Sequence, residues 1–196
     1  MMQKKPTNRQ IQAQQTKDRV YQVAIDLFET KSFENITVDE ICTLANVSTG
    51  TFYNVFKSKY EILDHIFELA DIYFKDTVSL HVLEGHTKDR ILRYFDYYTQ
   101  YTLDCGLEFA KQLYNVKNNL FAKENRIMQT VLLEIIRDGQ KRDELLNTIS
   151  AEDLVQFLFV CVRGLVYDWC IKDGRFDLKI AMRKHVERLL CIYENS

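Results

Sequence analysis

Residues 37–60 have the sequence TVDEICTLANVSTGTFYNVFKSKY, which predicts two short helices joined by a tight turn and the start of a third. Thr37 and Glu40 have the spacing of a capping box at the start of the first helix. The chain is expected to reverse at Asn46, because asparagine is the non-glycine residue that best tolerates a left-handed backbone. Together these signals predict a helix-turn-helix.

The second helix of this motif has a hydrophobic side and a polar side. Ser48 is expected to cap it, and Phe52 and Phe56, four residues apart, can both pack inward. Small polar groups and Tyr53 then face outward. A short helix with such a surface is suited to lie in the DNA major groove.

Two lysines flank the next predicted helix start. Ser58 and Glu61 form a second capping box, so this helix begins near Lys59. Lys57 and Lys59 then lie at the positive end of a helix dipole, where cations are disfavoured. A DNA phosphate would relieve this conflict, and the alternative is that both side chains extend into solvent.

This region resembles the TetR family of bacterial transcriptional repressors. The resemblance runs from Thr16 to about Leu63 and is strongest over VSTGTFYNVFKSKYEIL. Family members show a small residue, a glycine and a valine, a polar run, a Tyr-x-x-Phe pair, and a lysine before an acidic helix start. The corresponding residues are Ala45, Asn46, Val47, Tyr53, Phe56, Lys59 and Glu61. Asn46 replaces the usual glycine and Cys42 the usual alanine, and both substitutes are small or turn-tolerant.

The candidate DNA contacts divide into two groups. By resemblance, Thr37, Tyr53 and Lys59 are expected to contact phosphates. The polar residues of the second helix are candidates for base edges, and the Asn54 amide could bond an adenine edge in bidentate fashion. The full candidate DNA-binding set is Thr37, Thr49, Gly50, Thr51, Tyr53, Asn54, Lys57 and Lys59.

Composition agrees with the all-α protein of about nine helices that the helical segments along the chain predict. The 196 residues are 46% hydrophobic, and Pro6 is the single proline. We expect a helix-turn-helix DNA-binding domain over 1–60, with a flexible arm over 1–14, and a helical regulatory and dimerisation domain over 61–196. The N-terminus has no apolar stretch behind its basic residues, and five scattered cysteines suggest reduced thiols, so we expect a cytoplasmic protein.

Charge is distributed unevenly between these two predicted domains. Residues 1–60 hold 8 Lys/Arg and 6 Asp/Glu of the chain's 26 and 28, which leaves 18 and 22 for residues 61–196. The resulting net charges of +2 and −4 fit a small DNA-reading head on a body that does not touch DNA.

The remaining helices are expected near 15–30, 59–82, 87–104, 107–116, 123–142, 151–172 and 177–193. Breaks are expected at Glu84–His86, Gly106, Asn118–Asn119, Asn147–Ser150 and Asp173–Gly174. The helix near 59–82 is long enough to belong to both domains, which makes it the expected mechanical link.

Residues 154–171 form an unusually apolar segment whose clearly polar side chains are Gln156, Arg163 and Asp168. Two mid-segment charges, each costing about 2.5–3.5 kcal/mol at a bilayer centre, argue against a membrane span. A helix apolar on nearly every side must be covered on nearly every side. We therefore expect a homodimer through the helices near 151–172 and 177–193, as the resemblance also implies. The alternative is a core helix within one chain.

The region near 87–104 carries tyrosines at helical spacing, whose rings and hydroxyls could line an apolar pocket for an unknown small-molecule effector. The candidate effector-binding residues are Tyr94, Tyr98, Tyr101, Phe109, Met128, Val131 and Ile135. The alternative is that these tyrosines are ordinary core residues, and the family resemblance favours the pocket.

Catalytic signals are missing from the sequence. The four histidines are dispersed, and there is no glycine-rich phosphate loop, nucleophile elbow or paired-cysteine metal site. We expect no catalytic residue, metal or cofactor. The sequence predicts a dimeric repressor that binds a palindromic operator in double-stranded DNA and is released by an effector. The alternatives are a helical small-molecule-binding protein without specific DNA recognition and an unrecognised enzyme.

Overall fold

The computed structural model describes residues 7–31, 33–114, 121 and 126–194. Within these residues every regular element is helical, apart from one isolated β-bridge between Leu145 and Glu194. The all-α prediction is confirmed. The chain forms two compact units, Met1–Ile66 and Phe67–Ser196, so the unit boundary falls inside a helix rather than at its start.

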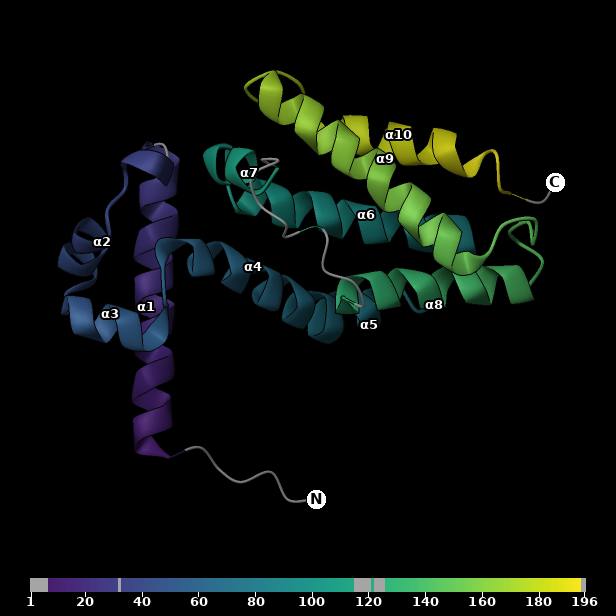
Figure 1. Cartoon of the computed structure of the whole chain (residues 1–196). Coiled ribbons are helices and arrows are strands. Elements are labelled where there is room, and N and C mark those ends of the chain that lie inside the picture. The colour runs from purple at the N-terminus through teal and green to yellow at the C-terminus, as the bar shows by residue number, and fades with distance from the viewer. Residues whose placement is uncertain (1–6, 32, 115–120, 122–125, 195–196) are drawn as a thin grey trace. The chain divides into compact units, whose positions relative to one another are not determined.

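Unit 1, the head, contains α1 (Asn8–Thr30), a 3₁₀ turn η1 (Phe33–Asn35), α2 (Val38–Ala45), α3 (Thr49–Val55) and the start of α4 (Lys59–Tyr73). In Figure 1, α2 and α3 lie on one side of α1, and α1 continues well past α3 towards its N-terminal end. The head core consists of apolar side chains from all four helices, including Val20, Phe28, Ile41, Phe52 and Ile62.

The first helix begins earlier than the sequence predicted. It was expected from about Gln15, but it begins at Asn8, where Thr7 and Gln10 form a complete capping box. The expected flexible arm over 1–14 is therefore wrong for residues 8–14, which are helical. Residues 1–6 lie outside the described part of the chain. No proline after Pro6 opposes this helix.

Unit 2, the body, contains the rest of α4, a π-helical turn η2 (Phe74–Val78), α5 (Ser79–His81), α6 (Thr87–Asp104), α7 (Leu107–Leu113), α8 (Ile127–Lys141), α9 (Ala151–Ile171) and α10 (Leu178–Leu190). These bounds agree with the predicted helices to within a few residues. The predicted break at Asn118–Asn119 and the ends near 115–116 and 123–125 lie outside the described residues.

The body core lies between α6, α8, α9 and α10, which pack against one another (Figure 1). Helix α8 approaches the start of α6 closely, because a Cβ atom at Gly139 would lie 2.4 Å from Thr87 Cγ2. Glycine is required at this close approach.

Helix α9 is long and apolar enough to cross a membrane by length and composition. In the structure one of its faces lies in the body core, through residues such as Leu158, Val162 and Val166, all fully buried. Within unit 2 it is therefore a core helix.

Candidate functional site

The helix-turn-helix has the local structure that the sequence predicted. The Thr37 hydroxyl accepts a hydrogen bond from the Glu40 backbone N–H at 3.2 Å, and the Ser48 hydroxyl accepts one from the Thr51 backbone N–H at 3.1 Å. Between the helices, Asn46 has φ 52° and ψ 52°, the expected left-handed conformation. One detail differs, because the Glu40 carboxylate pairs with Lys31 instead of completing the capping box.

Helix α3 separates its aromatic side chains as expected. Phe52 and Phe56 are buried in the head, whereas Tyr53 is 53% exposed. Gly50 and Asn54 are also exposed. The outer side of α3 is therefore a short polar surface, and the buried Phe52 and Phe56 fix the helix to the head.

The threonine hydroxyls of α3 are held by neighbouring groups of the head. Thr49 Oγ1 donates to Asp39 Oδ1 at 3.4 Å, and the hydroxyls of Ser48 and Thr51 lie 2.8 Å apart. Among the described hydrogen bonds none involves the Asn54 carboxamide, and the residue is exposed. Its donor and acceptor are therefore available to a partner outside the chain.

Gly50 occupies α3 without a structural need for glycine. A Cβ atom there would meet only Ser48 Oγ, at an ordinary 3.8 Å. Glycine in a helix costs about 0.5–1 kcal/mol relative to alanine. Its presence on the outer side of α3 leaves room for close approach of a partner outside the chain.

Lys59 has a position that the sequence did not predict. Its ammonium donates to the carbonyl oxygens of Phe33, Glu34 and Ile36 at 2.8, 3.3 and 2.9 Å, and lies 4.6 Å from the centre of the Phe33 ring. The carbonyl end of the η1 turn thus supplies the negative partner for which a phosphate was expected. Lys59 ties α4 to the segment that precedes α2.

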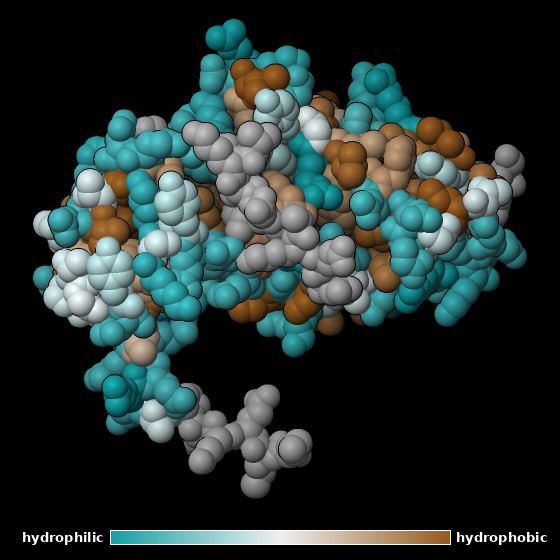
Figure 2. All heavy atoms as spheres, in the orientation of Figure 1, coloured by the Kyte–Doolittle hydropathy of each residue, from teal (hydrophilic) through white to brown (hydrophobic). Residues whose placement is uncertain are grey.

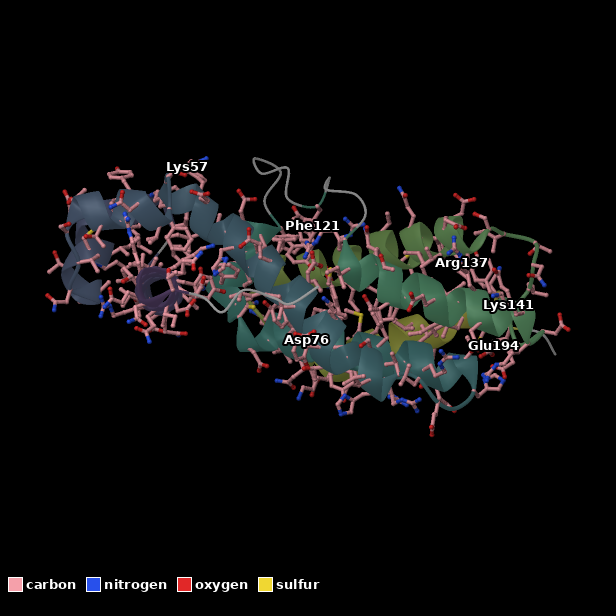
Figure 3. All side chains as sticks on the ribbon, turned by 90° about the horizontal axis from the view of Figure 1, so that it is seen from below. Lys57, Asp76, Phe121, Arg137, Lys141 and Glu194 are labelled. Atoms are coloured by element: carbon pink, nitrogen blue, oxygen red, sulfur yellow. The ribbon has the colours of Figure 1, made fainter. Side chains whose placement is uncertain are left out.

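Lys57 has the opposite environment. Its side chain is exposed and points away from the rest of the head (Figure 3). The Glu61 backbone N–H donates to Ser58 Oγ at 3.3 Å, as expected of a cap at Ser58. The Glu61 carboxylate accepts the backbone N–H of Lys57 rather than that of Ser58, so the expected capping box is only half formed. Of the two lysines, Lys57 is the one whose charge faces solvent.

In the body, the expected effector-binding tyrosines are turned inward and hydrogen-bonded. Tyr94 is fully buried, and its hydroxyl donates to the Met128 carbonyl oxygen at 2.7 Å. The hydroxyls of Tyr98 and Tyr114 lie 2.6 Å apart. Burial raises the pKa of Tyr94 well above its usual value, so its phenol stays protonated as a donor.

Most of the other expected effector residues join the same core. Val131 and Ile135 are buried in the cluster that contains Tyr94 and Tyr98, and Met128 packs against it partly exposed. Tyr101 instead stacks on Tyr73 of α4, with ring centres 5.4 Å apart. Phe109 is fully buried in α7.

A buried ion pair links α4 to the start of α8. Arg126 is 7% exposed, donates to both carboxylate oxygens of Asp71 at 3.1 Å, and donates to the Phe67 carbonyl oxygen at 2.7 Å. Asp71 also accepts the Met128 backbone N–H at 3.3 Å. Met128 therefore binds both groups: its carbonyl oxygen accepts from the Tyr94 hydroxyl, and its backbone N–H donates to the Asp71 carboxylate of α4.

This ion pair could not be predicted from the sequence. Asp71 and Arg126 lie 55 residues apart, and neither has a local pattern that marks a partner. The nearest signal is Asp71 itself, a carboxylate within the apolar run of α4.

A second arginine enters the aromatic part of the body. Arg163 of α9 donates to the carbonyl oxygens of Phe159 and Phe121 at 2.9 and 3.4 Å. Its guanidinium lies 5.4 and 5.8 Å from the centres of the Phe121 and Phe159 rings. Burial raises the pKa of Tyr98, and the positive charge of Arg163 partly offsets this effect.

The outer face of α9 exposes hydrophobic side chains in a stripe. Val160, Tyr167 and Ile171 are 58%, 49% and 60% exposed, and a Cβ atom at Gly164 would meet nothing within 4 Å. Ile180 of α10 is 68% exposed. Figure 2 shows hydrophobic side chains among polar ones on the surface of this unit. We call Val160, Gly164, Tyr167 and Ile171 the α9 stripe.

Comparison with known proteins gives a consistent result for both units. Residues 20–66 match the family model described as bacterial regulatory proteins, tetR family. The chain is 24% identical over 200 residues to the HTH-type transcriptional regulator AcrR of Shigella flexneri, a match that covers 93% of this chain and 91% of that protein.

Solved structures share the fold over nearly the whole chain. The fatty acid degradation regulator FadR from Bacillus halodurans has a TM-score of 0.76 at 18% identity, with 95% of this chain and 97% of that chain covered. FadR from Bacillus subtilis, solved in complex with stearoyl-CoA, has a TM-score of 0.75 at 19% identity, with 88% and 97% covered.

The matched residues 20–66 contain the helix-turn-helix, its caps and its hydrophobic anchor, and the fold similarity extends through the body. Over residues 20–66 the chain matches the tetR family of bacterial regulatory proteins, and over nearly its whole length it is similar to the transcriptional regulator AcrR.

Proposed function

We propose that this regulator is a cytoplasmic repressor that binds a palindromic operator as a homodimer and releases it when a small molecule binds the body. The observation that carries the DNA-binding part is the outer surface of α3, where exposed polar groups are held on the buried Phe52 and Phe56. A helix anchored in this way can enter the major groove without rearranging the head.

Within the head we assign different roles to the candidate residues. Asn54 and the exposed start of α3, Thr49, Gly50 and Thr51, face base edges. Thr37, Tyr53 and Lys57 contact phosphates. Because its ammonium binds three carbonyl oxygens, Lys59 acts mainly by fixing the start of α4.

The direct experiment is selection of genomic DNA fragments by the purified protein, followed by measurement of affinity for the selected site. An Asn54→Ala variant is expected to lose about 1–3 kcal/mol of discrimination at one base pair of each half-site. Lys141→Ala, an exposed lysine at the end of α8, serves as the control (Figure 3). Recovery of fragments without a shared sequence would contradict the proposal and favour a small-molecule carrier.

We propose that two copies meet through the α9 stripe and α10. Exposed hydrophobic side chains on a helix whose other face is already buried need a further partner, and Gly164 lets two backbones approach closely. A twofold axis there would present two heads to half-sites about 34–36 Å apart, or a multiple of that distance. Sedimentation of a Gly164→Arg variant, which places a charge in the middle of the stripe, is expected to give monomer. An unchanged dimer would exclude this interface.

For the effector, we propose an apolar molecule with a polar end that binds near Tyr94, Tyr98, Tyr101, Phe109, Met128, Val131 and Ile135. The support is the aromatic interior with phenol and guanidinium groups at its edge, and the stearoyl-CoA bound by the similar Bacillus subtilis FadR. Stearoyl-CoA is therefore the first probe, with coenzyme A alone as control. Release of bound operator by the ester and not by coenzyme A would support the proposal. Operator binding unchanged by the ester would exclude this ligand class.

The Asp71–Arg126 pair offers a route from such a ligand to α4. A ligand that displaces the Tyr94 hydroxyl from Met128 changes the residue that Asp71 also binds. A ligand can shift the operator equilibrium only by its difference in affinity for the two states of the body. We propose that this network is where that difference arises.

A further inference from the structure

The arginines inside the body differ in how their charge is balanced. Arg90 and Arg126 are buried, and each forms an ion pair with an aspartate. Arg163, which is partly buried, donates to the carbonyl oxygens of Phe159 and Phe121, and it takes part in none of the ion pairs of the described residues. Taking a guanidinium out of water is unfavourable unless an opposite charge replaces the water. Within the described part of the chain, the charge of Arg163 meets carbonyl oxygens and aromatic rings instead.

Arg163 belongs to a closed circle of side chains in the body. Its guanidinium lies 5.4 and 5.8 Å from the centres of the Phe121 and Phe159 rings. The centre of the Phe159 ring is 6.1 Å from that of Tyr98. The centre of the Phe121 ring is 4.8 Å from that of Tyr114 (Figure 3). The hydroxyls of Tyr98 and Tyr114, 2.6 Å apart, close the circle. We call these five residues the Arg163 cluster.

The Arg163 cluster contains hydrogen-bond donors that its own bonds do not use. Burial raises the pKa of both Tyr98 and Tyr114, and the positive charge of Arg163 partly offsets the rise. Both phenols therefore keep their hydrogens, and the bond between them uses one of the two O–H groups. A guanidinium also has more N–H donors than the two that Arg163 uses in the described bonds. A negatively charged oxygen beside these groups would accept from both kinds of donor.

We infer that the Arg163 cluster binds the carboxylate of an effector whose remaining part is apolar. The inference rests on the proposed release of operator by a small molecule, and it names the polar end of that molecule. A carboxylate fits because it accepts two parallel hydrogen bonds from a guanidinium and because its single charge matches that of Arg163. The phosphates of coenzyme A carry several charges, for which phenylalanine rings offer no partner. At this position the cluster therefore favours a free acid over a coenzyme A ester.

Three ligands with the same straight alkyl chain separate the effect of charge from that of apolar contact. They are decanoate, decan-1-ol and decylamine, and calorimetry gives their dissociation constants with the full-length protein. Decanoate is expected to bind about 10- to 100-fold more tightly than the alcohol, the range that a charge-assisted hydrogen bond provides. Decylamine is expected to bind most weakly, because its charge repels Arg163. Equal affinities for decanoate and the alcohol would overturn the proposal.

Variants of Arg163 assign this preference to one side chain. Arg163→Met keeps an unbranched side chain without the charge, and it is expected to remove the preference for decanoate while leaving the affinity for decan-1-ol unchanged. Arg163→Lys keeps the charge and is expected to retain part of the preference. The control is Arg137→Met, which removes an exposed arginine paired with Glu152 (Figure 3). Equal losses of affinity for acid and alcohol in Arg163→Met would overturn the proposal, since they indicate disturbed packing.

The carboxylate site and the proposed function fail differently, because ligand binding is measured without DNA. If decanoate binds through Arg163 but leaves the operator complex intact, the site is correct and release of operator by this ligand is wrong. If stearoyl-CoA releases operator from the unaltered chain and from Arg163→Met alike, while decanoate binds no better than the alcohol, release is correct and the carboxylate site is wrong.

Discussion

Tyr53 in the head and Tyr94 in the body carry the same chemical group in opposite environments. Tyr53 is 53% exposed on α3, whereas Tyr94 is fully buried with its hydroxyl on the Met128 carbonyl oxygen. In the head, the exposed Asn54 carboxamide takes part in none of the described hydrogen bonds, so it could bind DNA without breaking one. The body holds its polar groups in existing bonds, so any ligand that uses them must first displace a partner. The proposed binding of DNA at Asn54 would therefore leave the head unchanged, whereas the proposed ligand would have to rearrange hydrogen bonds of the body.

The largest effect is expected from breaking the buried ion pair of the body. Arg126→Met leaves the Asp71 carboxylate without its guanidinium, and loss of one partner from a buried pair costs about 3–5 kcal/mol. Because Asp71 is partly exposed, we expect a loss near the lower end, about 3 kcal/mol, by urea unfolding of the body. Arg183→Met, which breaks the exposed pair with Asp96, should cost under about 1 kcal/mol. Similar losses in both variants would contradict the importance of the Asp71–Arg126 network.

Two glycines of the body test its packing in opposite directions. Gly139→Ala forces a methyl group against Thr87 and is expected to cost about 1–3 kcal/mol, whereas Gly164→Ala meets open space and should be neutral or stabilising. Thermal unfolding of both variants at low protein concentration measures the difference. A stable Gly139→Ala protein would mean that α6 and α8 can separate easily.

In the head, Lys59 is expected to stabilise the fold, whereas Lys57 is expected to contact DNA. Lys59→Met keeps the aliphatic stem but removes three bonds to carbonyl oxygens, so we expect a loss of about 1–3 kcal/mol in head stability. Lys57→Ala should leave stability unchanged while reducing the salt dependence of DNA binding. If Lys59→Met instead changes the salt dependence without changing stability, Lys59 contacts phosphate.

The smallest effect is expected at Gly50. Gly50→Ala should stabilise the head by about 0.5–1 kcal/mol, because the added methyl meets only Ser48 at an ordinary distance. The same methyl should weaken operator binding if DNA approaches the α3 backbone there. Unfolding and operator affinity of the Gly50→Ala variant, each compared with the unaltered protein, test the two expectations. Unchanged affinity would mean that Gly50 is not a DNA contact.

The head was more predictable from sequence than the body. Its decisive signals, such as the caps at Thr37 and Ser48 and the left-handed Asn46, act over three or four residues. Local sequence therefore contains them. The capping box at Thr7 has the same form, but the glutamine-rich composition around it favours a disordered tail, so the sequence predicts α1 too short.

Contacts between distant segments could not be predicted in the same way. The helix dipole predicts a charge conflict at Lys59, but the carbonyl oxygens that the Lys59 ammonium binds are 23–26 residues earlier in the chain. Likewise, the pattern of tyrosines indicated an aromatic interior without showing that Arg126 and Asp71 would be bound beside it.

The π-helical turn Phe74–Val78 lies within the otherwise continuous helical run from Lys59 to His81. Such a turn contains one residue more than an α-helical turn, which rotates everything after it by about 100° relative to a regular helix. Phe74, Val78 and Val82 are all buried with this extra residue in place. Deleting a single residue between them would convert the turn to ordinary α-helix and swing Val82 away from the core. The extra residue of this turn therefore sets which side chains after Phe74 face the body core.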